Sequence, residues 1–111
     1  MNRYSILDKI EQRPGMYLSR PGFGAICDFI NGYDFALLYN QFAEQEQPPF
    51  SGFNDFVLKK LDKDWAIAPK VPGRIHPSLL SWERAIADAA PDDGEAMRIF
   101  FDFLRQYRHA T

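Results

Sequence analysis

The side chains best suited to chemistry in this 111-residue sequence are one cysteine, Cys27, and two histidines, His76 and His109. A structural zinc site takes about four such ligands. These three residues are far apart and lack the spacing of a metal-binding motif. A lone cysteine beside Ile26 is typical of a core position. We therefore expect no metal, no cofactor and no catalytic residue, and we expect that the chain is not an enzyme.

Two carboxylate pairs and one glycine-rich segment complete the candidates for chemistry. Asp92 and Asp93 stand at the expected start of a helix, where carboxylates cap free N–H groups. Glu44 and Glu46 precede a proline turn, which predicts a solvated helix end. Residues 21–24, Pro-Gly-Phe-Gly, open a helix as phosphate-binding loops do, but they lack the preceding strand and the lysine of such loops. We expect capping and helix entry from these residues, not catalysis.

Charge is spread unevenly along the chain, although the formal net charge is only −2. Residues 23–56 contain five acidic residues and no lysine or arginine. A stretch of this kind predicts an acidic surface that steers a basic partner. The acidic residues are Asp28, Asp34, Glu44, Glu46 and Asp55.

A modest basic patch follows the acidic stretch and surrounds Trp65. Its members are Lys59, Lys60, Lys63, Lys70 and Arg74. Acidic residues are interleaved with them, and the sequence pI is about 5.6. Proteins that bind nucleic acid usually carry a clearer basic footprint. We expect no nucleic-acid partner, and Trp65 remains a candidate for contact with another protein.

Helical periodicity accounts for most of the chain, and no strand-like alternation occurs. Apolar residues repeat every three or four positions in segments that proline and glycine separate. The expected helices cover about 4–12, 23–44, 51–61, 78–89 and 93–108, with Ser51 and Ser78 as N-caps of the third and fourth. Residues 16–18 should form an extended apolar plug, and the proline-rich residues 62–77 an irregular loop. The prediction is an all-α domain, an irregular bundle of about five helices in a single domain over residues 1–111.

The composition is sufficient for one hydrophobic core without a disulfide or metal. Hydrophobic residues make up 46% of the chain, and ten Phe, five Tyr and two Trp contribute large side chains. The residues that we expect to be mostly buried are Leu7, Tyr17, Ile26, Ile30, Tyr33, Phe56, Trp82, Phe100 and Phe103.

The sequence has no feature of a membrane or secreted protein. The N-terminal residues are charged and amphipathic, without the apolar region of a signal peptide. The longest apolar runs have four or five residues, far fewer than a membrane span needs. We expect a cytoplasmic location and no membrane partner.

Six short motifs are distributed along nearly the whole chain. They are Ile6-Leu-x-x-Ile10, Arg13-Pro-Gly-Met-Tyr-Leu18, Phe29-Ile-Asn-Gly-Tyr33, Phe53-x-x-Phe56-Val57, Ser81-Trp82 and Glu95-Ala96-x-x-x-Phe100-Phe101-x-x-Leu104. This ordered set resembles a group of small all-helical bacterial proteins. Some members of that group are immunity proteins encoded beside secreted antibacterial toxins.

The resemblance implies a protein that binds and neutralises a cognate toxin in the cytoplasm. Its matched residues are mostly apolar or turn-forming, so they indicate fold, and specificity should lie in exposed residues outside the motifs. Many toxins act on nucleic acids or nucleotides and present a basic cleft, which an acidic inhibitor complements. The candidate partner-binding residues are Asp28, Asp34, Glu44, Glu46, Asp55 and Trp65. The alternative is a small regulatory or scaffolding domain that binds a partner unrelated to toxins.

Overall fold

The computed structural model describes residues 2–18, 22–65 and 81–109, and the side chains of 62–65 lie outside that description. Every regular element in these ranges is helical, which confirms the predicted all-α class. The elements are α1 (Arg3–Gln12), α2 (Pro14–Tyr17), α3 (Phe23–Tyr39), the 3-10 turn η1 (Phe50–Gly52), α4 (Phe53–Trp65), α5 (Trp82–Ala89) and α6 (Asp93–Arg108). None of the described helices is long and apolar enough to cross a bilayer.

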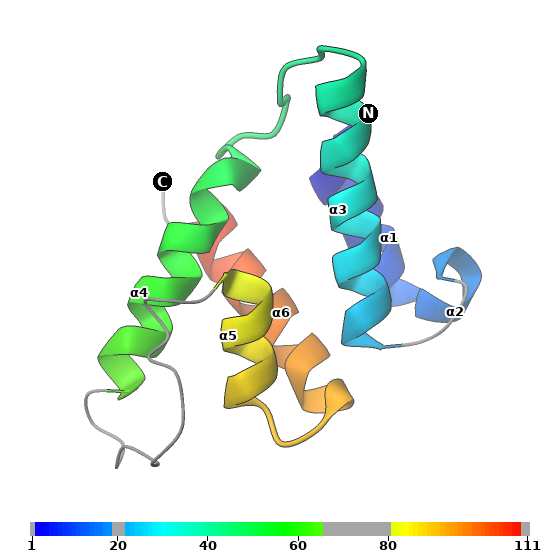
Figure 1. Cartoon of the computed structure of the whole chain (residues 1–111). Coiled ribbons are helices and arrows are strands. Elements are labelled where there is room, and N and C mark those ends of the chain that lie inside the picture. Colours follow the sequence, from blue (N-terminus) through cyan, green and yellow to red (C-terminus); the bar gives the residue numbers. More distant parts are fainter. Residues whose placement is uncertain (1, 19–21, 66–80, 110–111) are drawn as a thin grey trace.

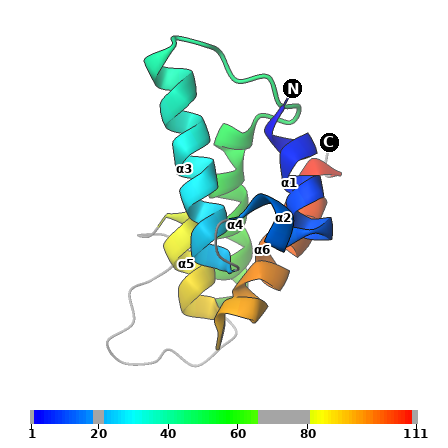
Figure 2. The ribbon, with the colours of Figure 1, turned by 90° about the vertical axis from the view of Figure 1, so that its right-hand side faces the viewer.

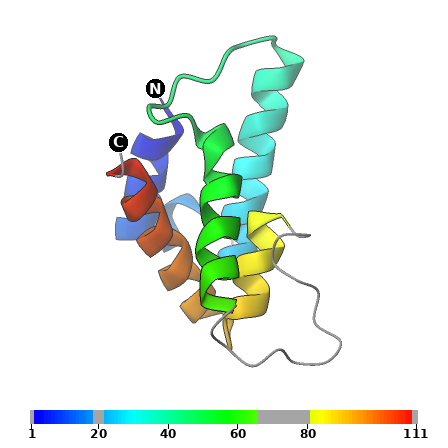
Figure 3. The same ribbon diagram turned by 90° about the vertical axis from the view of Figure 1, so that its left-hand side faces the viewer.

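The helices pack around one core (Figure 1). Helix α5 packs against α4 and α6, and α6 also contacts α3 and α4. Helix α1 runs beside α6, where Arg105 and Arg108 form ion pairs with Glu11 and Asp8. The side views show that the C-terminal end of α3, and the segment that follows it, extend beyond the other helices (Figures 2 and 3).

Aromatic rings from four elements form the centre of the core. Phe53 and Phe100 are fully buried, and their ring centroids lie 5.7 Å apart in an edge-to-face arrangement. Trp82 contacts both rings, at 5.4 Å and 5.3 Å, and Phe23 approaches Trp82 at 6.1 Å. Such pairs add to the free energy gained from burial alone. This cluster joins α3, α4, α5 and α6.

The carboxylates of Asp92 and Asp93 bind the N-termini of two different helices. The Asp92 side chain accepts a hydrogen bond from the Glu95 N–H at 2.8 Å and caps α6, as predicted. The Asp93 carboxylate accepts the Phe23 N–H at 3.0 Å and so occupies the N-terminus of α3. Gly22 has a φ of 122°, and a Cβ atom there would lie 2.2 Å from Asp93 Oδ2. The glycine therefore allows the contact that ties α3 to α6.

Several predicted helix ends are wrong. Ser51 lies within η1, so it does not cap α4, which begins at Phe53. Helix α4 continues through residues 62–65, which we expected to be irregular, since no helix-breaking residue occurs before Pro69. Ser78 lies outside the described residues, and the N-cap of α5 is Ser81. Helix α3 ends at Tyr39, five residues earlier than predicted.

The predicted core is confirmed at most of its positions. Five of the nine residues are buried, namely Leu7, Ile26, Ile30, Trp82 and Phe100. Tyr33, Phe56 and Phe103 are half-buried. Tyr17 was predicted wrongly, because it is 49% exposed on α2, a single helical turn where we expected an extended plug. Leu18, just after this turn, packs against the core instead.

Phe100 gives the sharpest test of this core. Phe100→Ala should lower the free energy of unfolding by about 3–5 kcal/mol, as large core truncations do. Urea denaturation measures the loss. The matched control is Phe35→Ala, because Phe35 is 66% exposed and its truncation should stay within about 0.5 kcal/mol of the native chain. Similar losses in the two variants would contradict this assignment of the core.

Candidate partner-binding surface

The C-terminal half of α3 leaves the body of the protein and exposes large apolar side chains. Phe35, Leu38, Tyr39 and Phe42 are between 66% and 78% exposed, and we call these four residues the aromatic tip. The Phe35 and Tyr39 rings stack at 6.1 Å, one helical turn apart. Scattered apolar residues are normal on a surface, but neighbouring large apolar side chains that are this exposed are typical of a contact site.

The backbone at the end of α3 determines the shape of the tip. The Phe42 N–H donates to the Leu37 carbonyl at 2.9 Å, and the Gln41 N–H donates to the Leu38 carbonyl at 3.2 Å. Together they form a Schellman motif, and Gln41 takes the left-handed conformation with a φ of 57°. This position usually holds glycine, because a side chain is strained there. The motif folds Phe42 back towards Leu37 and explains why α3 ends before Glu44.

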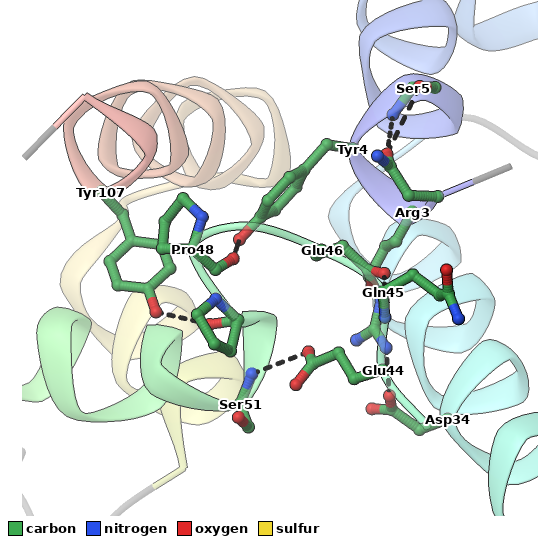
Figure 4. Close-up of polar contacts among 12 residues, drawn as sticks. Arg3, Tyr4, Ser5, Asp34, Glu44, Gln45, Glu46, Pro48, Ser51 and Tyr107 are labelled. Carbon is green, nitrogen blue, oxygen red and sulfur yellow. Dashed lines mark hydrogen bonds and ion pairs between the residues drawn. The ribbon is translucent and has the colours of Figure 1, made fainter. Parts of the chain in front are cut away.

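A buried arginine connects the segment after α3 to the N-terminus. Arg3 is 1% exposed, and its guanidinium carbon lies 4.6 Å from the Tyr33 ring centroid and 4.4 Å from that of Phe50. Its Nη2 lies 2.6 Å from Asp34 Oδ1, and its Nε lies 2.7 Å from Glu46 Oε1. The second contact is an ion pair without the alignment of a hydrogen bond. One guanidinium therefore meets two carboxylates (Figure 4). It also lies over the rings of Tyr33 and Phe50.

Three further contacts hold residues 43–49, the return segment, against the body. The Tyr4 hydroxyl donates to the Pro48 carbonyl at 2.5 Å, and the Tyr107 hydroxyl donates to the Pro49 carbonyl. The Ser51 N–H donates to Glu44 Oε1 at 3.0 Å. Figure 4 shows these anchors arriving from α1, α6 and η1. The return segment is thus fixed at both sides of Glu46.

Carboxylates outnumber cations around Tyr33, which lies beside the return segment. Burial raises the pKa of Tyr33 first, and Glu46, Asp34 and Glu44 raise it further, whereas Arg3 lowers it. Burial and then Glu44 also raise the pKa of Tyr107. At Tyr33, three carboxylates therefore act against a single guanidinium, and the surplus charge lies beside the aromatic tip.

Two grooves flank the contact between Leu37 and Phe42. One, of about 360 Å³, is lined by Arg3, Asp34, Leu37, Leu38, Phe42, Glu44, Phe50 and Ser51. The other, of about 370 Å³, is lined by Tyr33, Leu37, Phe42, Ala43 and Gln45. Both volumes are at the lower end of the range for ligand pockets. They suit a single inserted side chain better than a large ligand.

The predicted partner-binding residues have different surroundings. Asp34, which is exposed, and Glu44, which is half-buried, line one groove together. Asp28 is exposed on the first half of α3, and Asp55 is exposed in the first turn of α4. Glu46 is the exception, because its side chain is fully buried against Arg3 and is not the solvated helix end that we expected. Trp65 ends α4, and its side chain lies outside the described residues.

A signal for the buried pair is present in the sequence. Arg3, Leu7 and Ile10 have the +4, +3 spacing of one helix face, so a cation stands on an apolar stripe. Such a cation needs a buried carboxylate partner. The aromatic tip also has a signal, because Phe35, Leu38 and Tyr39 are apolar residues that lie off the stripe through Ile26 and Ile30.

The thiol of Cys27 is in poor surroundings for a nucleophile. It is half-buried, and burial followed by Glu83, Asp28 and Asp93 raises its pKa to about 12. The thiol is therefore protonated at neutral pH, whereas the thiolate is the reactive form. Among the described residues, no three His, Cys, Asp or Glu side chains come close enough to hold a metal ion. His76 lies outside those residues.

These observations define a small all-α domain with an acidic, aromatic surface at one end. Comparisons with protein-family models, with curated proteins and with solved structures found no match to this chain. The resemblance to small helical immunity proteins therefore stays a prediction from the sequence.

Replacement of Arg3 should test whether its ion pair with Glu46 holds the return segment against the body. Arg3→Met leaves Glu46 buried without a counter-ion and should cost about 3–5 kcal/mol in the free energy of unfolding. The double variant Arg3→Met with Glu46→Leu should recover most of that loss. Arg105→Met is the control, because its pair with Glu11 is solvent-exposed and contributes about 0–1 kcal/mol. Equal losses from Arg3→Met and Arg105→Met would refute the role given to Arg3.

The titration of the Tyr4 hydroxyl in alkaline solution should report on the same group of residues around the return segment. Burial, followed by Tyr107, Glu44 and Glu46, raises the pKa of Tyr4 well above its usual value. A raised native pKa contributes stability that is complete below the unfolded pKa of about 10 and is lost as the pH rises above it. Absorbance at 295 nm should show a late tyrosine phase whose amplitude falls in Tyr4→Phe, with Tyr33 and Tyr107 contributing the remainder. The amplitude should stay unchanged in Tyr39→Phe, because that ring is exposed. A late phase of undiminished amplitude in Tyr4→Phe would contradict this assignment.

Proposed function

We propose that this chain is an immunity protein that binds a secreted antibacterial toxin in the cytoplasm and blocks it through the aromatic tip. The observation that carries the proposal is the exposure of the four tip side chains beside a surplus of carboxylates. Aromatic anchors contribute most of the binding energy in many protein interfaces. An acidic rim around them adds steering towards a basic cleft.

Charge complementarity supports a basic protein as the partner. The segment 23–56, which contains α3 and the return segment, has no lysine or arginine of its own. The guanidinium of Arg3 is enclosed and already paired, so it offers little positive charge to a visitor. A second copy of the chain would bring the same acidic surface against itself if two tips met. A toxin that presents a basic cleft fits this surface better.

The experiment starts from the tagged chain purified from its native host, with its major bound protein identified by mass spectrometry. Support for the proposal requires that this protein is a secreted toxin and that the purified chain inhibits it. Phe35→Ser with Tyr39→Ser should then weaken toxin binding by roughly thirtyfold, because interface anchors contribute about 2 kcal/mol or more. The melting temperature should change little, since both side chains are exposed.

The matched control is Met16→Ser with Tyr17→Ser, which removes two exposed apolar side chains from α2. This variant should bind the toxin as the native chain does. Full inhibition by the tip variant would move the interface away from the tip. A major partner that is not a toxin would favour a regulatory or scaffolding domain. Self-association that the tip variant abolishes in sedimentation would make a second copy the occupant instead.

A further inference from the structure

The groove between the end of α3 and the return segment combines apolar walls with two acidic side chains. Leu37, Leu38, Phe42 and Phe50 supply the walls, and Asp34 and Glu44 supply the carboxylates. Figure 4 shows both carboxylates below Arg3, on the side away from the buried Glu46. A long aliphatic stem with a cationic head matches such a groove, because the stem contacts the walls while the head pairs with the carboxylates.

Each carboxylate keeps one oxygen for a visitor. Asp34 uses Oδ1 for Arg3, and Glu44 uses Oε1 for the Ser51 N–H. Among the described residues, Asp34 Oδ2 and Glu44 Oε2 have no hydrogen-bond partner. The protein contacts therefore fix the two side chains in position without using all of their acceptors, which lowers the ordering cost of binding.

The positive charge of Arg3 does not exclude a second cation from the groove. Glu46 is fully buried against the Arg3 guanidinium and balances its charge. Asp34 and Glu44 then remain as a surplus of two negative charges at the groove. The upward shift of the Tyr33 pKa, to which all three carboxylates contribute against Arg3 alone, agrees with that balance.

We propose that this groove receives one arginine side chain of the partner protein, with its guanidinium between Asp34 and Glu44 and its stem along Leu38 and Phe42. Arginine fits better than lysine, because a planar fork can donate to two carboxylates and lie against an aromatic ring at once. The partner's identity rests on the proposed function, but the recognition of a guanidinium does not. The groove thus becomes the specificity pocket of the aromatic tip.

The test uses n-butylguanidinium as the probe, with n-butylurea as its neutral counterpart of nearly the same shape. The uniformly ¹⁵N-labelled full chain is titrated with each probe at constant ionic strength, and amide shifts are followed by NMR. We expect saturable shifts at Leu37, Leu38, Phe42, Glu44 and Ser51 with n-butylguanidinium, in the millimolar range. Binding of n-butylurea should be several-fold weaker, because it carries no charge.

Glu44→Gln separates charge from structure, since glutamine keeps an acceptor for the Ser51 N–H. This variant should weaken n-butylguanidinium binding by roughly three- to fivefold, as loss of an exposed charge pair does. Glu11→Gln removes an exposed carboxylate outside the groove and should leave the affinity unchanged. Because no toxin is present, this test separates failure of the pocket from failure of the immunity function.

Three outcomes would overturn the pocket. One is the absence of saturable shifts at the lining residues in the native chain. Another is an equal response to n-butylguanidinium and n-butylurea, which would mean that the groove recognises only the apolar stem. The third is an equal loss of affinity in Glu44→Gln and Glu11→Gln, which would reduce the effect to the overall charge of the chain.

Discussion

The buried guanidinium of Arg3 is the constraint on which the rest of this surface depends. An unpaired charge at this depth would cost several kcal/mol, so the chain must bring carboxylates to it. Glu46 arrives from 43 positions along the sequence, and Asp34 arrives from the middle of α3. If α3 continued past Tyr39 as a straight helix, it would carry Glu46 away from the body. The need to pair Arg3 therefore agrees with the early helix end and the return segment.

The need to pair Arg3 also explains why apolar side chains at the end of α3 stay in solvent. The first half of α3 packs its stripe through Phe23, Ile26 and Ile30 into the core. Beyond Ile30 the helix leaves the body, so Leu38 and Tyr39 have no protein surface to cover them. The core is filled instead by the aromatic cluster around Phe53 and Phe100. Exposed apolar groups that fold stability does not require are typical of contact surfaces.

Local patterns in the sequence predicted the elements well and their long-range partners badly. The stripes through Ile26 and Ile30 and through Phe100 depend on spacing within one helix, so periodicity predicts them. The pairing of Arg3 with Glu46 depends on tertiary folding and leaves only a weak signal in the sequence. Summing charge over 23–56 found the acidic stretch but treated Glu46 as surface, because a sum carries no information on burial. The sequence places the end of α3 too late, because Gln41 stands at a position where a glycine usually marks the end of a helix.

In the proposed interface, stability and recognition share side chains, and that sharing limits what each can do. Asp34 pairs with Arg3 through Oδ1, so a visiting cation at Oδ2 shares this carboxylate with a contact that helps to hold the fold. Glu44 pairs only with a backbone N–H, which donates its hydrogen bond without cancelling the charge. A carboxylate in that position is both oriented and still charged. Of the acidic residues here, Glu44 is therefore the one best placed to give attraction towards a partner without weakening the buried ion pair.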